Sequence, residues 1–258
     1  MKPVKIIFFD IDGTLVDPAT RSIPESTREA LRRLRQKGIL LCVATGRPTA
    51  SLPDFGDLRF DAYCTFNGSL CFAGEQVLHS HPLTREDAAQ IMKNAAALGR
   101  PVAVATRHRL DANGVEPDLA DYYRLANLEL HASPDFDTLC REDIYQIMLG
   151  CRPEDHEAIL QGTQQAKIAV SWDRAVDVIP AGSGKGSALG KILDHFRLDA
   201  GQALAFGDSY NDLEMLQLVG TAVVMGNAPA ALKAIADEVC GHVSQDGIYR
   251  YCAEHGLI

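Results

Sequence analysis

Short apolar runs recur in the outer thirds of the chain, and each ends in small and polar residues. Three of them are VKIIFFDIDGT (4–14), ILLCVATGR (39–47) and QALAFGDSYND (202–212). A run of apolar residues without alternation is typical of a strand that is buried on both faces. TAVVMGN (221–227) has the same character, and Asn227 is a candidate N-cap for a helix that begins near residues 228–229.

Helical periodicity lies between these runs. Residues 26–37 bring Ala30, Leu31 and Leu34 to one face, and Gly38 follows as a stop signal. Residues 187–197 repeat the pattern with five apolar residues, Ala188, Leu189, Ile192, Leu193 and Phe196. Because strands alternate with helices, the outer thirds predict an α/β fold with a doubly wound, mostly parallel, Rossmann-like sheet.

The middle third has a different order of elements. Its pattern predicts helices at 84–98, 116–126 and 153–162, and strands at 101–107, 109–113, 143–150, 166–172 and 175–180. Neighbouring strands joined by tight turns are typical of a mixed α+β domain. We therefore expect a catalytic core of residues 1–82 and 183–258 and an inserted α+β cap domain of residues 83–182. HSHPLT (79–84) and PAGSGKG (180–186) are the expected linkers.

Composition narrows the classes of protein. The chain has 258 residues, of which 47% are hydrophobic and 23% charged, as in an ordinary globular protein. A formal charge of −9 argues against a nucleic-acid surface, which would need a basic face. The apolar start, Ile6 to Phe9, is too short for a signal or a membrane span. We expect a cytoplasmic protein without nucleic-acid or membrane partners, and the oligomeric state stays open.

The segment PAGSGKGS (180–187) resembles a phosphate-binding loop but fits neither nucleotide motif. A P-loop needs a glycine where Ile179 stands, and a serine or threonine directly after the lysine, where Gly186 stands. The Rossmann glycine pattern also fails, because Ser187 occupies its third glycine position. The role of Lys185 must therefore come from the rest of the chain.

Polar residues gather where the predicted parallel strands end, which is where open α/β sheets place their functional groups. The opening run delivers two carboxylates and the next run a hydroxyl and an unhindered backbone N–H. The candidates at the strand ends are Asp10, Asp12, Thr45, Gly46, Asp208, Asn211 and Asp212, with Lys185 just before a predicted helix. Each has a simpler reading by itself, as a turn or capping residue.

Asp10 and Asp12 lie two residues apart at a strand end, so both project toward the same side before Gly13 turns the chain. Two carboxylates so close should not ionise equally. A cation beside Asp10 would keep it an anion and a nucleophile, which leaves Asp12 to hold and give a proton. Asp208, on another strand end, adds the second carboxylate that Mg²⁺ prefers.

Four segments together resemble the motifs of the haloacid-dehalogenase-like superfamily. These are Asp10-Ile11-Asp12-Gly13-Thr14-Leu15, Ala44-Thr45-Gly46-Arg47, Lys185-Gly186 and Gly207-Asp208-Ser209-Tyr210-Asn211-Asp212, without a departure in any of them. The insert lies between the threonine and lysine motifs, which resembles the Cof-type sugar-phosphate phosphatases.

The resemblance implies a Mg²⁺-dependent phosphatase that hydrolyses small phosphate monoesters, with sugar phosphates as the expected substrates, through an aspartyl-phosphate intermediate. It implies that Asp10 is the nucleophile and Asp12 the general acid and base. Mg²⁺ would be held by Asp10, Asp208 and the backbone carbonyl of Asp12. Thr45, Gly46, Lys185 and Asn211 would bind the phosphate, and Asp212 would orient Lys185 or a metal-bound water.

Two other functions stay open at this point. A phosphomannomutase-like enzyme keeps both aspartates and a similarly placed cap but returns the phosphoryl group to a sugar. A non-catalytic sensor of a phosphorylated ligand would use the same fold without turnover. The carboxylic acid of Asp12 favours a phosphatase or a phosphomutase over the superfamily's transport ATPases and phosphonate hydrolases, which lack an acid at that position. The expected partner is a small phosphorylated metabolite whose identity the residues do not name.

The insert is expected to act as a lid that excludes water and contacts the leaving group. Arg107, His108, Arg109 and Asp111 lie at a predicted strand turn, where they either contact a sugar or form a solvated hairpin tip. Trp172, in a predicted strand, is expected to pack in the core and not to serve as a sugar platform.

Overall fold

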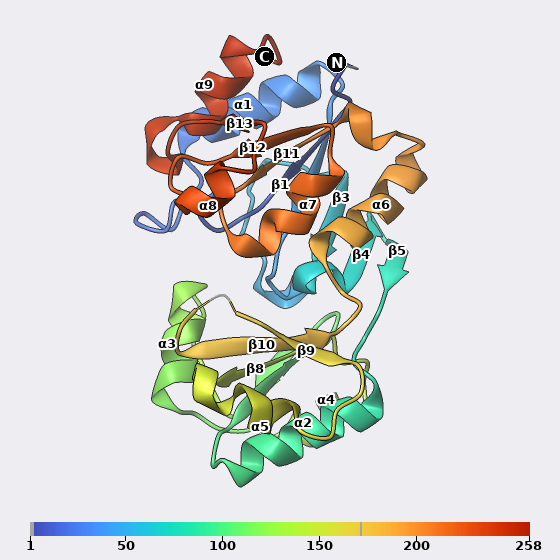
Figure 1. The fold of residues 1–258 in the computed structure, drawn as a ribbon, viewed down its shortest axis with the longest axis vertical. Helices are drawn as coiled ribbons and strands as arrows, with labels where there is room; N and C mark the ends of the chain where they lie inside the picture. The colour runs from blue at the N-terminus through green and yellow to red at the C-terminus, as the bar shows by residue number, and fades with distance from the viewer. Residues whose placement is uncertain (1–2, 171) are drawn as a thin grey trace. The chain divides into compact units, whose positions relative to one another are not determined.

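The computed structural model describes residues 3–170 and 172–258, and it divides into two compact units (Figure 1). The first unit contains the chain up to Gly46 together with Asp54–His79 and Gly184–Ile258. The second contains Arg47–Pro53 and Ser80–Ser183. Among the described residues, no helix has the length and apolar character that crossing a membrane requires.

The first unit is built on an eight-stranded sheet in the order β13-β12-β11-β1-β2-β3-β4-β5. Its strands are β1 (Ile6–Phe9), β2 (Leu40–Ala44), β3 (Ala62–Thr65), β4 (Leu70–Ala73), β5 (Gln76–Ser80), β11 (Ala203–Gly207), β12 (Thr221–Val224) and β13 (Glu238–Val239). All pairs from β13 to β3 are parallel, and β4 runs antiparallel to β3. The predicted mostly parallel α/β fold is confirmed.

Helices cover both faces of this sheet, and successive residues of β1 pack alternately against the two helical layers. Ile6 and Phe8 pack in one cluster with residues of α6 (Lys185–Phe196), α7 (Leu213–Leu218) and α8 (Ala230–Lys233). On the other face, Phe9 stacks on Phe206 at 5.4 Å, and Phe206 meets Tyr251 edge-on. Tyr251 belongs to α9 (Gly247–Glu254), which packs against α1 (Glu25–Gln36). Burial on two faces explains the unbroken apolar runs.

The second unit is built on a five-stranded sheet in the order β7-β6-β8-β10-β9. Its strands are β6 (Val102–Ala105), β7 (Leu110–Ala112), β8 (Gln146–Gly150), β9 (Ala166–Ala169) and β10 (Ala175–Pro180), and every pair is antiparallel. Residues of α2 (Arg85–Ala97), α4 (Phe136–Leu139) and α5 (His156–Leu160) form an apolar cluster with one face. The remaining helix, α3 (Pro117–Leu125), packs on β8 and β10.

Several elements differ from the sequence prediction in extent. The helix expected at 153–162 begins with a 3₁₀ turn, Pro153–Asp155, before α5. The strand expected at 166–172 ends at Ala169, and its residue Ser171 lies outside the described residues. Strands β3, β4 and β5 were not predicted.

Two residue-level predictions are wrong. Trp172 does not pack in the core: it lies half-buried between β9 and β10, where it stacks on Tyr122 at 6.1 Å and under the Arg174 guanidinium at 4.0 Å. Asn227 does not cap α8, because this helix begins at Ala230 with Pro229 at its N-cap. The side chain of Asn227 instead makes long-range hydrogen bonds in the first unit.

Residues 107–109 do lie at the tip of the β6–β7 hairpin. His108 is exposed there, and Arg109 forms an ion pair with Asp111. Both side chains of this pair are partly exposed, so it contributes little to stability.

Candidate active site

The end of β1 places Asp10 deep in the first unit, where it is only 5% exposed. Its backbone N–H continues the parallel ladder to Phe206 of β11. Asp12 is exposed, so the two carboxylates have different environments. Gly13 has a φ of +85°, and a side chain on it would collide with the carboxylate of Asp208. A glycine is therefore required for the loop after β1 to approach the loop after β11.

Lys185 is the first residue of α6 and is 1% exposed. Its Nζ donates hydrogen bonds of 2.6 Å to Oδ1 of Asp10 and 2.6 Å to Oδ1 of Asp212. Burial alone would lower the pKa of Lys185, but the charges of these two aspartates outweigh it and raise the pKa above its ordinary value. Lys185 is therefore a buried ammonium held between two carboxylates.

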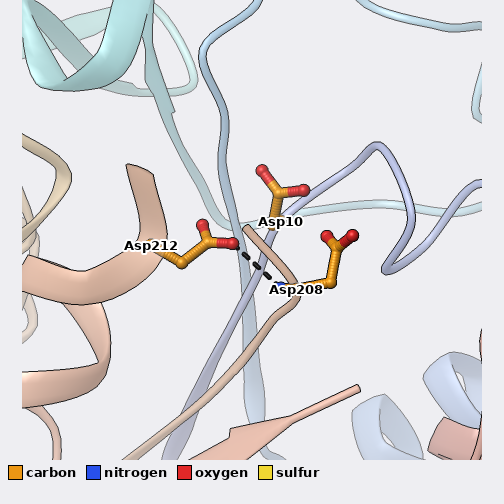
Figure 2. A group of neighbouring side chains, drawn as sticks. All are labelled: Asp10, Asp208 and Asp212. Atoms are coloured by element: carbon orange, nitrogen blue, oxygen red, sulfur yellow. Dashed lines mark hydrogen bonds between the residues drawn. The ribbon is translucent and has the colours of Figure 1, made fainter. Parts of the chain in front are cut away.

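Asp212 is fully buried, and both of its carboxylate oxygens have partners. Oδ1 accepts from Lys185, and Oδ2 accepts from the backbone N–H groups of Asp208 and Ser209 at 2.9 and 3.0 Å. Figure 2 shows the bond to Asp208, with Asp10 close by. Asp212 thus fixes both the ammonium of Lys185 and the start of the loop after β11.

Asp208 is held by two side chains from distant parts of the sequence. Its Oδ1 accepts from the hydroxyl of Thr14 at 3.0 Å, and its Oδ2 accepts from Nδ2 of Asn227 at 3.2 Å. Burial, and then the charge of Asp212, raise the pKa of Asp208 to about 7. Burial also raises the pKa of Asp10 well above its ordinary value, although Lys185 opposes this; the charges of Asp212 and Asp208 add to the rise.

The donor set fits a hard divalent cation. Asp10, Asp208 and Asp212 each place a carboxylate oxygen within 4.8 Å of the others (Figure 2). Asp212 is committed to N–H donors, whereas the hydrogen bonds to Asp10 and Asp208 leave carboxylate lone pairs for a metal. Three crowded carboxylates share one ammonium, and a divalent cation would relieve the repulsion that remains.

The loops after β2, β3 and β11 meet at a pair of asparagines. Nδ2 of Asn211 donates to Oδ1 of Asn67 at 3.1 Å, and the backbone N–H of Asn67 donates to the carbonyl of Thr45 at 3.1 Å. A side chain on Gly46 would approach Oδ1 of Asn67 to 2.9 Å. The structure therefore brings Asp10, Lys185, Asp208 and Asp212 into one network, and it links Thr45, Gly46 and Asn211 through Asn67.

The sequence analysis missed three polar residues of this region, Thr14, Asn67 and Asn227. Thr14 lies inside the motif of residues 10–15, in which the sequence analysis assigned roles only to Asp10 and Asp12. Asn227 was interpreted as a helix cap, although its Nδ2 also donates to the carbonyl of Gly13 at 2.8 Å. For Asn67, the turn dipeptide Asn67-Gly68 between apolar residues was an available signal of two strands joined by a turn.

Comparison with known proteins agrees with this geometry. Residues 7–251 match the family model described as haloacid dehalogenase-like hydrolase. The chain is 33% identical to YkrA of Bacillus subtilis (strain 168), over 98% of both chains. It is 32% identical to the HMP-PP phosphatase of Cronobacter sakazakii (strain ATCC BAA-894), over 94% of this chain and 92% of that one.

A solved structure, that of the subclass IIB sugar phosphatase BT4131, matches with a TM-score of 0.89 and 29% identity, over 99% of this chain and 100% of that one. The chain therefore belongs to the haloacid dehalogenase-like hydrolase family. Within this family it is a Cof-type, subclass IIB phosphatase, with a mostly parallel core sheet and a separate antiparallel cap sheet, and it hydrolyses phosphoric monoesters.

Proposed function

We propose that the protein is a Mg²⁺-dependent phosphatase of small sugar phosphates that works through a phosphorylated Asp10. The observation that supports this most directly is the buried bridge from Lys185 to Asp10 and Asp212, 2.6 Å on each side. It holds a permanent positive charge beside a carboxylate at a strand end. Such a pair suits an anion that must be both bound and attacked.

In the first proposed step, a carboxylate oxygen of Asp10 forms a bond to phosphorus while the bond from phosphorus to the ester oxygen breaks. Asp12 donates a proton to the departing alkoxide, and its exposure lets it reach a leaving group from the solvent side. In the second step, Asp12 as a base takes a proton from water. That water attacks phosphorus, the bond to Asp10 breaks, and inorganic phosphate leaves.

The metal would be held by the carboxylates of Asp10 and Asp208 and by the backbone carbonyl of Asp12. When bound, Mg²⁺ neutralises charge on the transferred phosphoryl group. Thr45, Gly46, Lys185 and Asn211 form the proposed phosphate-binding set. Asp212 would orient Lys185 without contacting the phosphate. Its hydrogen bonds support this role, because one carboxylate oxygen accepts from Lys185 and the other from the backbone N–H of Asp208.

The substrate class has support from relatives that act on different small molecules. One is named as an HMP-PP phosphatase and another as a sugar phosphatase. Both names describe small phosphorylated compounds, and an acid at Asp12 suits the poor alkoxide leaving group of a sugar. The proposal assigns residues 1–82 and 183–258 to the catalytic core and residues 83–182 to the cap.

A screen of phosphorylated metabolites with Mg²⁺, repeated with a chelator, tests this function. We expect release of inorganic phosphate from hexose or pentose phosphates, and loss of that release when the chelator removes the metal. Isomer formation from one hexose phosphate, with little phosphate release, would instead identify a phosphosugar mutase. Binding without turnover of any compound would leave only a sensor and would contradict the proposal.

A further inference from the structure

We propose that Asn67, in the turn after β3, donates a hydrogen bond from its side-chain amide to the bound phosphoryl group. Asn211 then acts as a positioning residue that orients Asn67. This inference rests on the proposed phosphatase function and assigns to it a residue outside the four sequence motifs. It also moves the direct contact from Asn211, where the sequence placed it, to Asn67.

The first observation is an incomplete pair of amides, formed by the buried Asn67 and the partly buried Asn211. One hydrogen bond, from Nδ2 of Asn211 to Oδ1 of Asn67, joins the two side chains. Asn67 is 4% exposed, and its Nδ2 has no partner; neither has Oδ1 of Asn211. Only five buried side-chain polar atoms in the described parts of the chain lack a partner, and two of them belong to this pair. Because buried polar groups are almost always paired, the unpaired Nδ2 of Asn67 indicates a ligand that brings an acceptor.

The second observation is the backbone of the turn that carries Asn67. Phe66, Asn67 and Gly68 have φ values of +53°, +51° and +98°, so three successive residues adopt left-handed conformations. Glycine adopts this conformation freely and asparagine tolerates it, so the cost falls mainly on Phe66, whose conformation persists because the surrounding structure imposes it. Phe66 is fully buried, which anchors the turn. The turn thus places an unfavourable φ on Phe66 and keeps Asn67 buried.

The third observation is what this turn touches. A side chain on Gly68 would lie 2.2 Å from the carbonyl of Gly184, which immediately precedes Lys185. The backbone of Asn67 bonds Thr45, and its amide lies against Gly46. Asn67 is therefore surrounded by Thr45, Gly46 and the start of α6, which supply three members of the proposed phosphate-binding set. A phosphoryl oxygen held by these groups is an acceptor for its unpaired N–H.

The test is the substitution Asn67→Gly, which removes the amide and keeps a residue that favours a positive φ. We expect a rise of about 10- to 100-fold in the inhibition constant of inorganic phosphate, since a hydrogen bond to a charged acceptor is lost. The value of kcat/KM for para-nitrophenyl phosphate should fall by a similar factor. Asn67→Asp, which puts a negative charge in the same place, should lose more than Asn67→Gly.

Asn127→Gly is the matched control, because Asn127 is also an asparagine with a positive φ, +59°, and lies in the second unit. It should leave phosphate inhibition unchanged. Urea unfolding of each variant separates a weakened fold from a lost contact. An Asn67→Gly protein with parental phosphate inhibition and kcat/KM overturns the inference, whatever its stability.

Asn211→Ala distinguishes the contacting from the positioning residue. If Asn211 only orients Asn67, its loss should be smaller than that of Asn67→Gly, and adding it to Asn67→Gly should change little further. A larger loss for Asn211→Ala than for Asn67→Gly would return the contact to Asn211. The parent protein is assayed alongside the variants. If the parent releases no phosphate from any substrate, the proposed function fails. If the parent is active and Asn67→Gly does not change its kinetics, only the inference about Asn67 fails.

Discussion

The two units of the molecule each bury an aspartate, but in opposite electrostatic surroundings. In the parallel sheet unit, Asp10 lies among charges, with Lys185 in contact and Asp208 and Asp212 nearby. In the antiparallel sheet unit, Asp177 of β10 is 2% exposed, and its hydrogen-bond partners are the neutral side chains of Tyr122 and Gln146. Burial raises the pKa of Asp177 to about 7, and those two hydrogen bonds oppose the rise only in part.

The difference distinguishes a buried carboxylate that can bind a cation from a buried carboxyl group that stays neutral by holding a proton. Asp177 can be buried as a neutral acid, because protonation removes the charge that burial disfavours. Around Asp10, one ammonium faces three carboxylates, so the network is completed by further positive charge, which a divalent metal brings. Burial of an aspartate therefore indicates a site only when other charges are buried with it.

Asp10→Asn should produce the largest effect, because it removes the proposed nucleophile from the charged cluster. We expect kcat for para-nitrophenyl phosphate to fall by at least about 10⁴-fold. Circular dichroism should show a retained fold, since an amide of the same size can still accept from Lys185. The control is Asp194→Asn, an exposed position of α6, which should keep the parental rate. A folded Asp10→Asn enzyme with parental activity would disprove the nucleophile assignment.

Lys185→Met should produce the next largest effect, because it removes the ammonium and leaves buried carboxylates without a cation. The expected loss in the free energy of unfolding, measured with urea in the absence of metal, is about 3–5 kcal/mol. The matched control is Lys191→Met on the same helix, where the lysine is exposed and the change should stay within about 0.5 kcal/mol. Equal stability of the two variants would mean that Lys185 does not hold the cluster together.

Asp177 predicts that the stability of the protein depends on pH, and Asp10 and Asp208 of the charged cluster add to this dependence in the same direction, because burial raises their pKa values as well. Because the pKa of Asp177 is higher in the folded protein than the ordinary value of 3.8, the folded state binds its proton more tightly. Its contribution to stability is therefore complete below about pH 4 and is lost as the pH rises to about 7. The slope in this window reaches about 1.4 kcal/mol per pH unit. Urea unfolding between pH 4 and 8 should show a shallower decline for Asp177→Asn than for the parent, because only the contribution of Asp177 is removed, and a decline as steep as that of the parent would contradict this role of Asp177.

The exposed Asp12 contrasts with the buried aspartates, and its proposed role as the general acid can be tested with two substrates. Asp12→Ala should lower kcat for a hexose phosphate by about 10²-fold, since the alkoxide leaves without its proton. The loss for para-nitrophenyl phosphate should be smaller, because nitrophenolate leaves without protonation. Equal losses for the two substrates would count against the role of Asp12 as the acid.

The sequence predicted most of this site because its charged residues follow buried strands. Asp10 and Asp208 come directly after apolar runs, and a parallel sheet brings such ends together. Lys185 and Asp212 followed from motifs with fixed spacing. The five-stranded sheet was also predicted strand by strand from its short apolar segments and turns, although its strand ends were less accurate.

The missed residues depend on contacts that no local pattern encodes. Asn67 meets Asn211 across 144 positions of sequence, and Asn227 meets Gly13 across 214. A single asparagine after a strand is compatible with a cap, a turn or a ligand contact, and only the three-dimensional neighbours decide. Trp172 was misplaced because the strand predicted to reach residue 172 ends at Ala169, and Tyr122 and Arg174 supply its contacts beyond the strand.

The enclosure of Lys185 has a practical consequence for chemical labelling. An ammonium that is 1% exposed and bonded to two carboxylates is shielded from amine-acylating reagents in the folded protein. Acylation of the surface lysines should therefore spare this one amine until the network opens. Mass spectrometry of the peptide that contains Lys185 would then report, without any substrate, when the network around this residue opens.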